Sequence, residues 1–214
     1  MNGVAPLVLS LAVSFAAVPA QARSMESLKA LGARFSAASA VLPKELGDQD
    51  PARALRYARL GSDRAYRLGM DLQMMRRTAA EASTVLAEVA TDPARRERLE
   101  FLLKFLLDAY PVQGDGASYV MDKALWLKYE IAAPVAPELR EAVIALVERF
   151  QAADAATKAL RADVDALAAA VKAAPAAGER SVWLSEGLAD SAGRQEAYSA
   201  YALPKVELLL PLVR

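Results

Sequence analysis

The chain has 214 residues and is 55% hydrophobic, so it can form one well-buried domain or two small ones. Its 26 basic and 26 acidic side chains balance, which gives no overall attraction to nucleic acid or anionic lipid. The absence of cysteine and histidine excludes disulfides, thiolate chemistry, the usual zinc sites and imidazole catalysis.

The first 22 residues carry no charged side chain and predict a secretory signal peptide. An apolar core over 4–18 precedes Ala20-Gln21-Ala22, which has the small-x-small form of a signal-peptidase site. An uncleaved membrane anchor is the alternative, but the Ala, Ser and Pro content makes a weak spanning helix. We therefore expect residues 1–22 to be removed and the protein to be periplasmic or secreted in a bacterium, where a cysteine-free helical core is sufficient.

Two helices are predicted next. Residues 24–42 carry apolar side chains at three- and four-residue steps and end at Pro43. From Asp50 to Thr91 the steps alternate between four and three, which keeps one side of a helix of about forty residues facing a partner. Asp50-Pro51 favours the start of this helix, because Asp accepts free amide protons and Pro has none to leave unpaired. The side facing the partner consists of Ala54, Ala58, Gly61, Ala65, Leu68, Leu72, Met75, Ala79, Ala82, Leu86 and Val89.

The middle of the chain predicts two shorter helices. Asp92-Pro93 ends the long helix and starts another, which Pro111 closes. Residues 111–116 are rich in Gly and Asp and predict a turn. A further helix is expected over 117–132.

A second long helix begins at Pro137 and repeats the four-three pattern over about forty residues. Its apolar side consists of Leu139, Val143, Leu146, Phe150, Ala153, Thr157, Leu160, Val164, Leu167 and Val171. Two such helices are expected to pack on one another or on the same neighbours. The predicted fold is therefore an all-α, elongated up-down bundle of four to six helices over residues 23–204, with two helices of about 40 residues and almost no sheet.

The C-terminal region is less regular. Gly187 and Gly193 interrupt a helical pattern that resumes over 195–203, and Pro204 is expected to stop it. The tail over 205–214 is apolar, so it either packs back along the bundle or docks into a partner.

The first long helix also carries a basic and aromatic face, which is the best candidate for contact with a partner. Forked guanidinium donors on neighbouring turns can hold an anion or an acidic helix. A solvated face that pairs with the acidic second half of the chain is the alternative. The predicted partner- or anion-binding residues are Arg53, Arg56, Tyr57, Arg64, Tyr66 and Arg67, together with Leu208, Leu209, Leu210 and Leu212 of the tail.

Other side chains suggest packing rather than chemistry. Met70, Met74 and Met75 offer the soft thioether ligands of a copper(I) site, but such clusters usually fill gaps in cores, so no metal or cofactor is predicted. Trp126 and Trp183 are expected to anchor the core or helix contacts. With no catalytic set in view, the chain is not expected to be an enzyme.

The expected function is that of an exported, non-catalytic helical bundle that acts through protein contacts, as an adaptor, a chaperone-like protein or an accessory subunit. A protein partner or self-association is expected, with no nucleic acid and no membrane span after cleavage of the signal. The alternative is a binding module that holds a small apolar or anionic ligand in or at the mouth of the bundle, in a cavity lined by Leu72, Met75 and Phe150.

Overall fold

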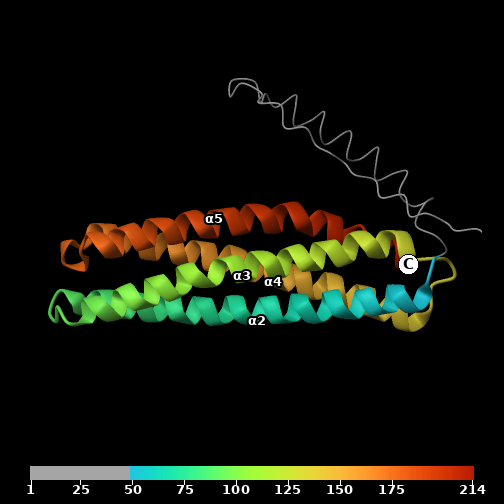
Figure 1. Cartoon of the computed structure of the whole chain (residues 1–214), viewed down its shortest axis with the longest axis horizontal. Helices are drawn as coiled ribbons and strands as arrows, with labels where there is room; N and C mark the ends of the chain where they lie inside the picture. Colours follow the sequence, from blue (N-terminus) through green and yellow to red (C-terminus); the bar gives the residue numbers. More distant parts are fainter. Residues whose placement is uncertain (1–48) are drawn as a thin grey trace, which may run out of the picture. The chain divides into compact units, whose positions relative to one another are not determined.

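The computed structural model describes residues 49–214, which form four long α-helices (Figure 1). These are α2 (Pro51–Val89), α3 (Arg95–Glu130), α4 (Pro137–Ala173) and α5 (Glu179–Glu207). A short 3-10 helix, η1 (Pro175–Ala177), joins α4 to α5, and α6 (Leu210–Val213) ends the chain. The described residues contain no strand, which confirms the all-α bundle. The predicted signal peptide and the helix expected over 24–42 lie outside the described residues.

The four helices are arranged so that α2 and α5 each pack on both α3 and α4. Contacts between α2 and α4 join residues 86 or 87 positions apart, as in the 2.7 Å ion pair of Arg76 with Asp163, so these helices run parallel. By contrast, α2 and α3 form an antiparallel hairpin, and so do α4 and α5. The segment between α3 and α4 therefore crosses the end of the bundle diagonally.

The apolar sides predicted for the two long helices form the contact between α2 and α4. Every predicted side chain of α4 is buried, and so is every one of α2 except Leu86, in whose place Val85 is buried. Gly61 lies at a close approach of the helices, because a Cβ there would lie 3.0 Å from Leu146 Cδ1 and 3.4 Å from Lys123 Cβ. The expectation that these two helices pack on one another is confirmed.

The predicted break at 111–116 is wrong, because α3 is continuous through this segment. Pro111 lacks the amide proton that would bond one turn back, a loss that costs roughly 3 kcal/mol in a helix interior. Leu106, Tyr110 and Ala117 are buried on either side of it, and burial stabilises each large side chain by about 1.5–3 kcal/mol. Tertiary packing therefore overrides the local signal of the proline.

The predicted interruptions near the C-terminus are also wrong. Gly187, Gly193 and Pro204 all lie inside α5, which continues to Glu207. Gly193 lies directly beneath the side chain of Arg161, since a Cβ there would come 2.7 Å from its Nη1 atom. The glycine therefore permits close contact between α4 and α5 rather than ending the helix.

The apolar tail packs back on α4, which was one of its two expected arrangements. Leu209 and Val213 are buried, and Arg140 Nε donates a 2.8 Å hydrogen bond to the carbonyl oxygen of Val213. Leu208 and Leu212 remain exposed.

Replacing Pro111 tests how far packing overrides its cost. Pro111→Ala should raise the free energy of unfolding by about 1–2 kcal/mol, because it restores a helical hydrogen bond but also frees the unfolded chain. Chemical denaturation measures the change. Pro51→Ala, at a first-turn position that tolerates proline, is the control and should change stability by less than about 0.5 kcal/mol. A less stable Pro111→Ala protein would contradict this account.

Candidate functional site

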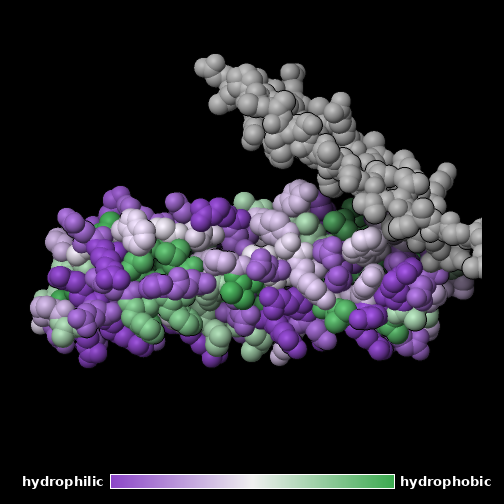
Figure 2. Space-filling view, viewed as in Figure 1, coloured by the Kyte–Doolittle hydropathy of each residue, from purple (hydrophilic) through white to green (hydrophobic). Residues whose placement is uncertain are grey.

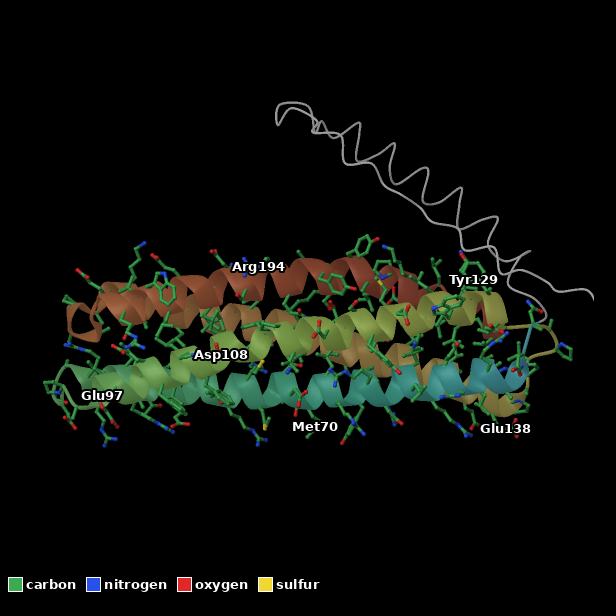
Figure 3. All side chains as sticks on the ribbon, in the orientation of Figure 1. Met70, Glu97, Asp108, Tyr129, Glu138 and Arg194 are labelled. Atoms are coloured by element: carbon green, nitrogen blue, oxygen red, sulfur yellow. The ribbon has the colours of Figure 1, made fainter. Side chains whose placement is uncertain are left out.

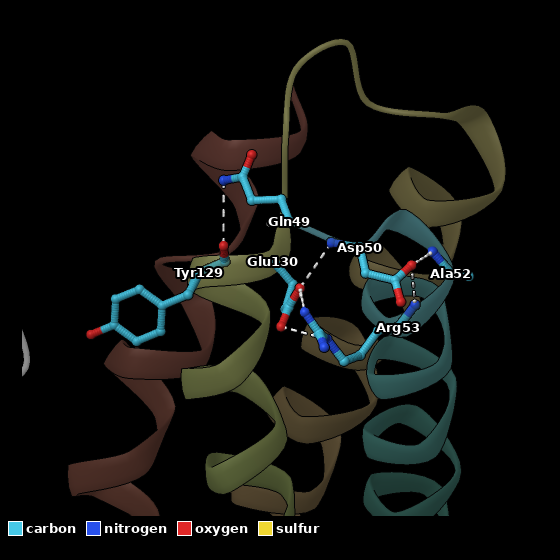
Figure 4. Close-up of polar contacts among 6 residues, drawn as sticks. All are labelled: Gln49, Asp50, Ala52, Arg53, Tyr129 and Glu130. Carbon is cyan, nitrogen blue, oxygen red and sulfur yellow. Dashed lines mark hydrogen bonds and ion pairs between the residues drawn. The ribbon is translucent and has the colours of Figure 1, made fainter. Parts of the chain in front are cut away.

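The residues of the predicted basic face of α2 lie in three different environments: one end of the bundle, the contact with α3, and the side that faces α4 or solvent. Arg53 lies at the end of the bundle (Figure 4). Arg53 Nε lies 2.6 Å from Glu130 Oε1, and its Nη2 donates to Oε2 at 2.9 Å. The hydrogen bond to Glu130 raises the pKa of Arg53. Glu130, buried at the end of α3, also accepts the backbone amide of Asp50, the residue that caps α2. Arg53 is therefore engaged within the bundle.

Tyr57 and Arg64 lie on the side of α2 that faces α3. The ammonium of Lys123 lies 5.3 Å from the Tyr57 ring centre and 4.8 Å from that of Tyr119. The guanidinium of Arg64 fits over Gly116, where a Cβ would lie 3.2 Å from Nη2. Both side chains therefore belong to the contact between the two helices.

The other predicted residues of α2 face α4 or solvent. Tyr66 lies beside the guanidinium of Arg149, whose central carbon is 5.4 Å from the ring centre. Arg56 and Arg67 are exposed, and neither forms an ion pair within residues 49–214. The structure thus does not bring the predicted six residues into one cluster, and only these two arginines keep their charges unpaired on the solvent side.

An exposed apolar stripe on α3 was not predicted. Phe105, Val112, Tyr119 and Trp126 follow one another at seven-residue steps and are 50%, 54%, 38% and 38% exposed. Seven residues make about two helical turns, so these side chains form a line along α3. The opposite side of α3 is already buried in the bundle core. This stripe is therefore available for a contact that the bundle itself does not make.

A matching line on α2 runs beside the stripe. Arg53, Leu60, Arg67, Met74 and Glu81 are also spaced by seven, and both ends of this line meet α3, through Arg53 with Glu130 and Glu81 with Arg98. The side chains between those ends include the exposed Leu60 and Met74.

We define the α2–α3 surface by the exposed residues of the two lines. On the visible face in Figure 2, hydrophobic side chains gather toward the end of the bundle where α2 is joined to α3, and isolated ones lie farther along. The residues of this surface are Leu60, Arg67, Met74, Phe105, Val112, Tyr119 and Trp126.

The reason that sequence reasoning missed this surface is the break expected at Pro111. The seven-residue spacing of Phe105, Val112, Tyr119 and Trp126 is visible in the sequence, but it crosses that position. Trp126 and Trp183 were expected in the core or in contacts between helices, and the core placement is wrong because both side chains are exposed. Once α3 is known to be continuous, the spacing alone identifies the stripe.

A second set of polar groups lies inside the bundle, between α3, α4 and α5. Asp154 is buried, accepts a 2.8 Å hydrogen bond from Ser199 Oγ, and pairs with Lys158 Nζ at 2.7 Å. The hydrogen bond to Asp154 raises the pKa of Lys158. The Tyr110 hydroxyl is buried and has no hydrogen-bond partner among the described residues. The described residues contain no group of three acidic side chains that could hold a metal.

The internal ligand cavity expected for a binding module is not found where it was predicted. Leu72, Met75 and Phe150, which were expected to line a ligand cavity, are core residues at most 3% exposed. A groove of about 680 Å³ lies between α2 and α4 instead, and is lined in part by Arg76 and Asp163. Those two side chains already pair with each other.

Comparison with known proteins gives no relative: no protein family, curated protein or solved structure matches this chain. None of the helices formed by residues 49–214 combines the length and the hydropathy that a bilayer-spanning segment requires.

The buried Tyr110 hydroxyl leads to a pH-dependent prediction. Burial raises the pKa of Tyr110 above its ordinary value near 10, so the folded state keeps a proton that the unfolded chain loses. The raised pKa therefore leaves the free energy of unfolding unchanged well below pH 10, where both states are protonated, and lowers it as the pH rises through 10. Between about pH 9 and 11, the free energy of unfolding should therefore fall less for Tyr110→Phe than for the wild type. At pH 7 the free energy of unfolding of Tyr110→Phe should equal that of the wild type or be higher by up to about 1 kcal/mol.

Denaturant unfolding of both proteins at pH 7 and over about pH 9 to 11 measures this difference in the free energy of unfolding. Tyr201→Phe, at an exposed position of α5, is the control and should follow the wild-type pH dependence. Equal pH dependence in wild type and Tyr110→Phe would contradict the proposed effect of burial.

Proposed function

We propose that this protein is an exported, non-catalytic helical bundle that acts through protein contacts, as an adaptor, a chaperone-like protein or an accessory subunit, and that the α2–α3 surface makes the contact. The observation that supports this proposal best is the straight line of four exposed apolar side chains on α3. A helix of a monomeric bundle normally shows a polar solvent side. A line of exposed apolar side chains along one side of a helix is typical of a surface that binds another protein.

The composition of the surface also favours a protein as partner. Trp126, Tyr119 and Arg67 are of the three residue types that most often contribute strongly to binding. Asp108, Asp115 and Asp122 lie beside the apolar line and supply a charged rim. A small ligand would instead need an enclosed pocket, whereas this surface follows the length of two helices.

The proposal of export rests on the uncharged segment over 1–22 and its small-x-small end. The proposal of a non-catalytic role rests on the residue types of the chain and on the use of its charges. Charged side chains such as Arg53, Arg98 and Arg76 pair across helix contacts rather than converging on one point. The exposed Leu208 and Leu212 of the tail are a second, smaller candidate for contact.

Site-directed photo-crosslinking tests the contact surface. A photoreactive residue at Val112 or Tyr119 should give a covalent adduct with another protein chain in cells that export the protein. The same probe at Arg194 is the matched control, because Arg194 lies on α5, on the opposite side of the bundle from Met70 on α2 (Figure 3). Equal adducts at all three positions, or none at Val112 and Tyr119, would refute the proposed surface.

Protein sequencing tests export. The exported protein should begin at Arg23, and Ala22→Phe should retain residues 1–22, because signal peptidase needs a small residue before the cleaved bond. Ser24→Ala, just beyond the bond, is the control and should be cleaved like the wild type. A wild-type protein that keeps its first 22 residues would rule out cleavage.

A further inference from the structure

The charged side chains on and beside the α2–α3 surface differ in sign between its two helices. On α2, Arg56 and Arg67 are exposed and form no ion pair within residues 49–214. On α3, Asp115 likewise has no ion pair among these residues. Asp108 and Asp122 pair only with exposed or neighbouring lysines of the same helix, an arrangement that contributes little. The α2 side of the surface is therefore net basic, although Asp71 lies among its arginines, and the α3 side is net acidic.

We propose that the occupant of the α2–α3 surface is a second copy of this chain, an inference that rests on the proposed function. A two-fold axis that runs along the helices and lies in the surface exchanges the positions of α2 and α3. It places α2 of one copy over α3 of the other, with the two helices antiparallel. Basic then faces acidic twice, and apolar side chains face apolar side chains between them.

The register within one chain indicates which residues would meet. Within the chain, Arg64 lies level with Val112 and Gly116, and Arg53 lies level with Glu130. A two-fold rotation about an axis parallel to the helices does not change the height of a residue along the bundle. Arg67 of one copy therefore comes level with Asp115 of the other, next to Val112 at the middle of the apolar line.

The size of the surface is sufficient for a stable dimer. Helices α2 and α3 are about 50 Å long, and two helices side by side are about 20 Å wide. The outline of the whole α2–α3 side of the bundle is thus roughly 1,000 Å² per copy, compared with the about 800 Å² per partner that is typical of specific complexes. Burial of Phe105, Val112 and Met74 would supply its apolar centre.

Charge reversal with mixing of variants gives a decisive experiment. In a dimer of Arg67→Glu alone, each substituted side chain faces Asp115 of the other copy, which gives two repulsive contacts. In a dimer of Asp115→Arg alone, each substituted side chain faces Arg67 of the other copy, with the same result. We expect each to raise the dimer dissociation constant by at least about tenfold. In an equimolar mixture of the two variants, a mixed dimer has opposite charges at both contacts, so dimers should return to nearly the wild-type level.

Light scattering or analytical ultracentrifugation of the purified chain over micromolar concentrations measures these masses. Val112→Asp, at the centre of the line, should also abolish the dimer. Trp183→Ala, an exposed aromatic on α5, is the control and should leave it unchanged. Circular dichroism melting verifies that each variant is folded, which is expected because all these side chains are exposed.

Three results would overturn the inference: a monomeric wild type, a dimer unaffected by Arg67→Glu and Val112→Asp, or variants that stay monomeric when mixed. A monomeric wild type that still crosslinks from Val112 to a different protein would overturn only the second copy as occupant. Absence of any adduct from both Val112 and Tyr119 would overturn the proposed function as well.

Discussion

The close contact between α2 and α4 is the constraint on which the rest of the bundle depends. At Gly61 the space beside α2 is limited by Leu146 of α4 and by Lys123 of α3, so a larger side chain would displace both neighbours. Small residues along this part of α2 permit that approach. Because α2 and α4 are parallel and adjacent, the chain must cross diagonally after α3, and α3 and α5 become the second parallel pair.

That second pair has a more polar interior than the first. Asp154 and Ser199 form a buried hydrogen bond between α4 and α5, while Gln113 Oε1 and Gln195 Nε2 are buried and have no hydrogen-bond partner among the described residues. Buried polar groups add little net stability, but they penalise every register that leaves them unpaired. We interpret the apolar contact of α2 with α4 as the main source of stability and the hydrogen bond of Ser199 with Asp154 as the contact that favours the observed register of α5. The unpaired Tyr110 hydroxyl shows that this polar interior is not optimised for stability.

The sequence predicts the parts of the fold that depend on long periodic patterns. The buried sides of α2 and α4 follow from spacing alone, because about ten consecutive apolar steps outweigh any local signal. Pro111, Gly193 and Pro204 misled the prediction for the opposite reason. Each is a strong local breaker, and only the burial of its neighbours in three dimensions shows that the helix continues.

The basic face illustrates a different limit. Arg53, Arg64 and Arg67 are close in sequence, but one meets Glu130, one covers Gly116, and one faces solvent. Spacing places residues on a helix, but it does not reveal which neighbour stands opposite them.

The continuity of α3 connects the fold to the proposed contact. A turn at 111–116 would have pointed Phe105 and Tyr119 in unrelated directions, and no common surface would exist. Because burial of Tyr110 and Ala117 keeps the helix intact through Pro111, the seven-residue spacing becomes a straight line beside α2. On the opposite side of the bundle, α5 exposes Trp183 and Tyr201 far apart, and isolated exposed aromatics are ordinary on protein surfaces. The same packing that overrides the proline thus concentrates the exposed apolar area on the α2–α3 side, where its opposite charges favour a second copy.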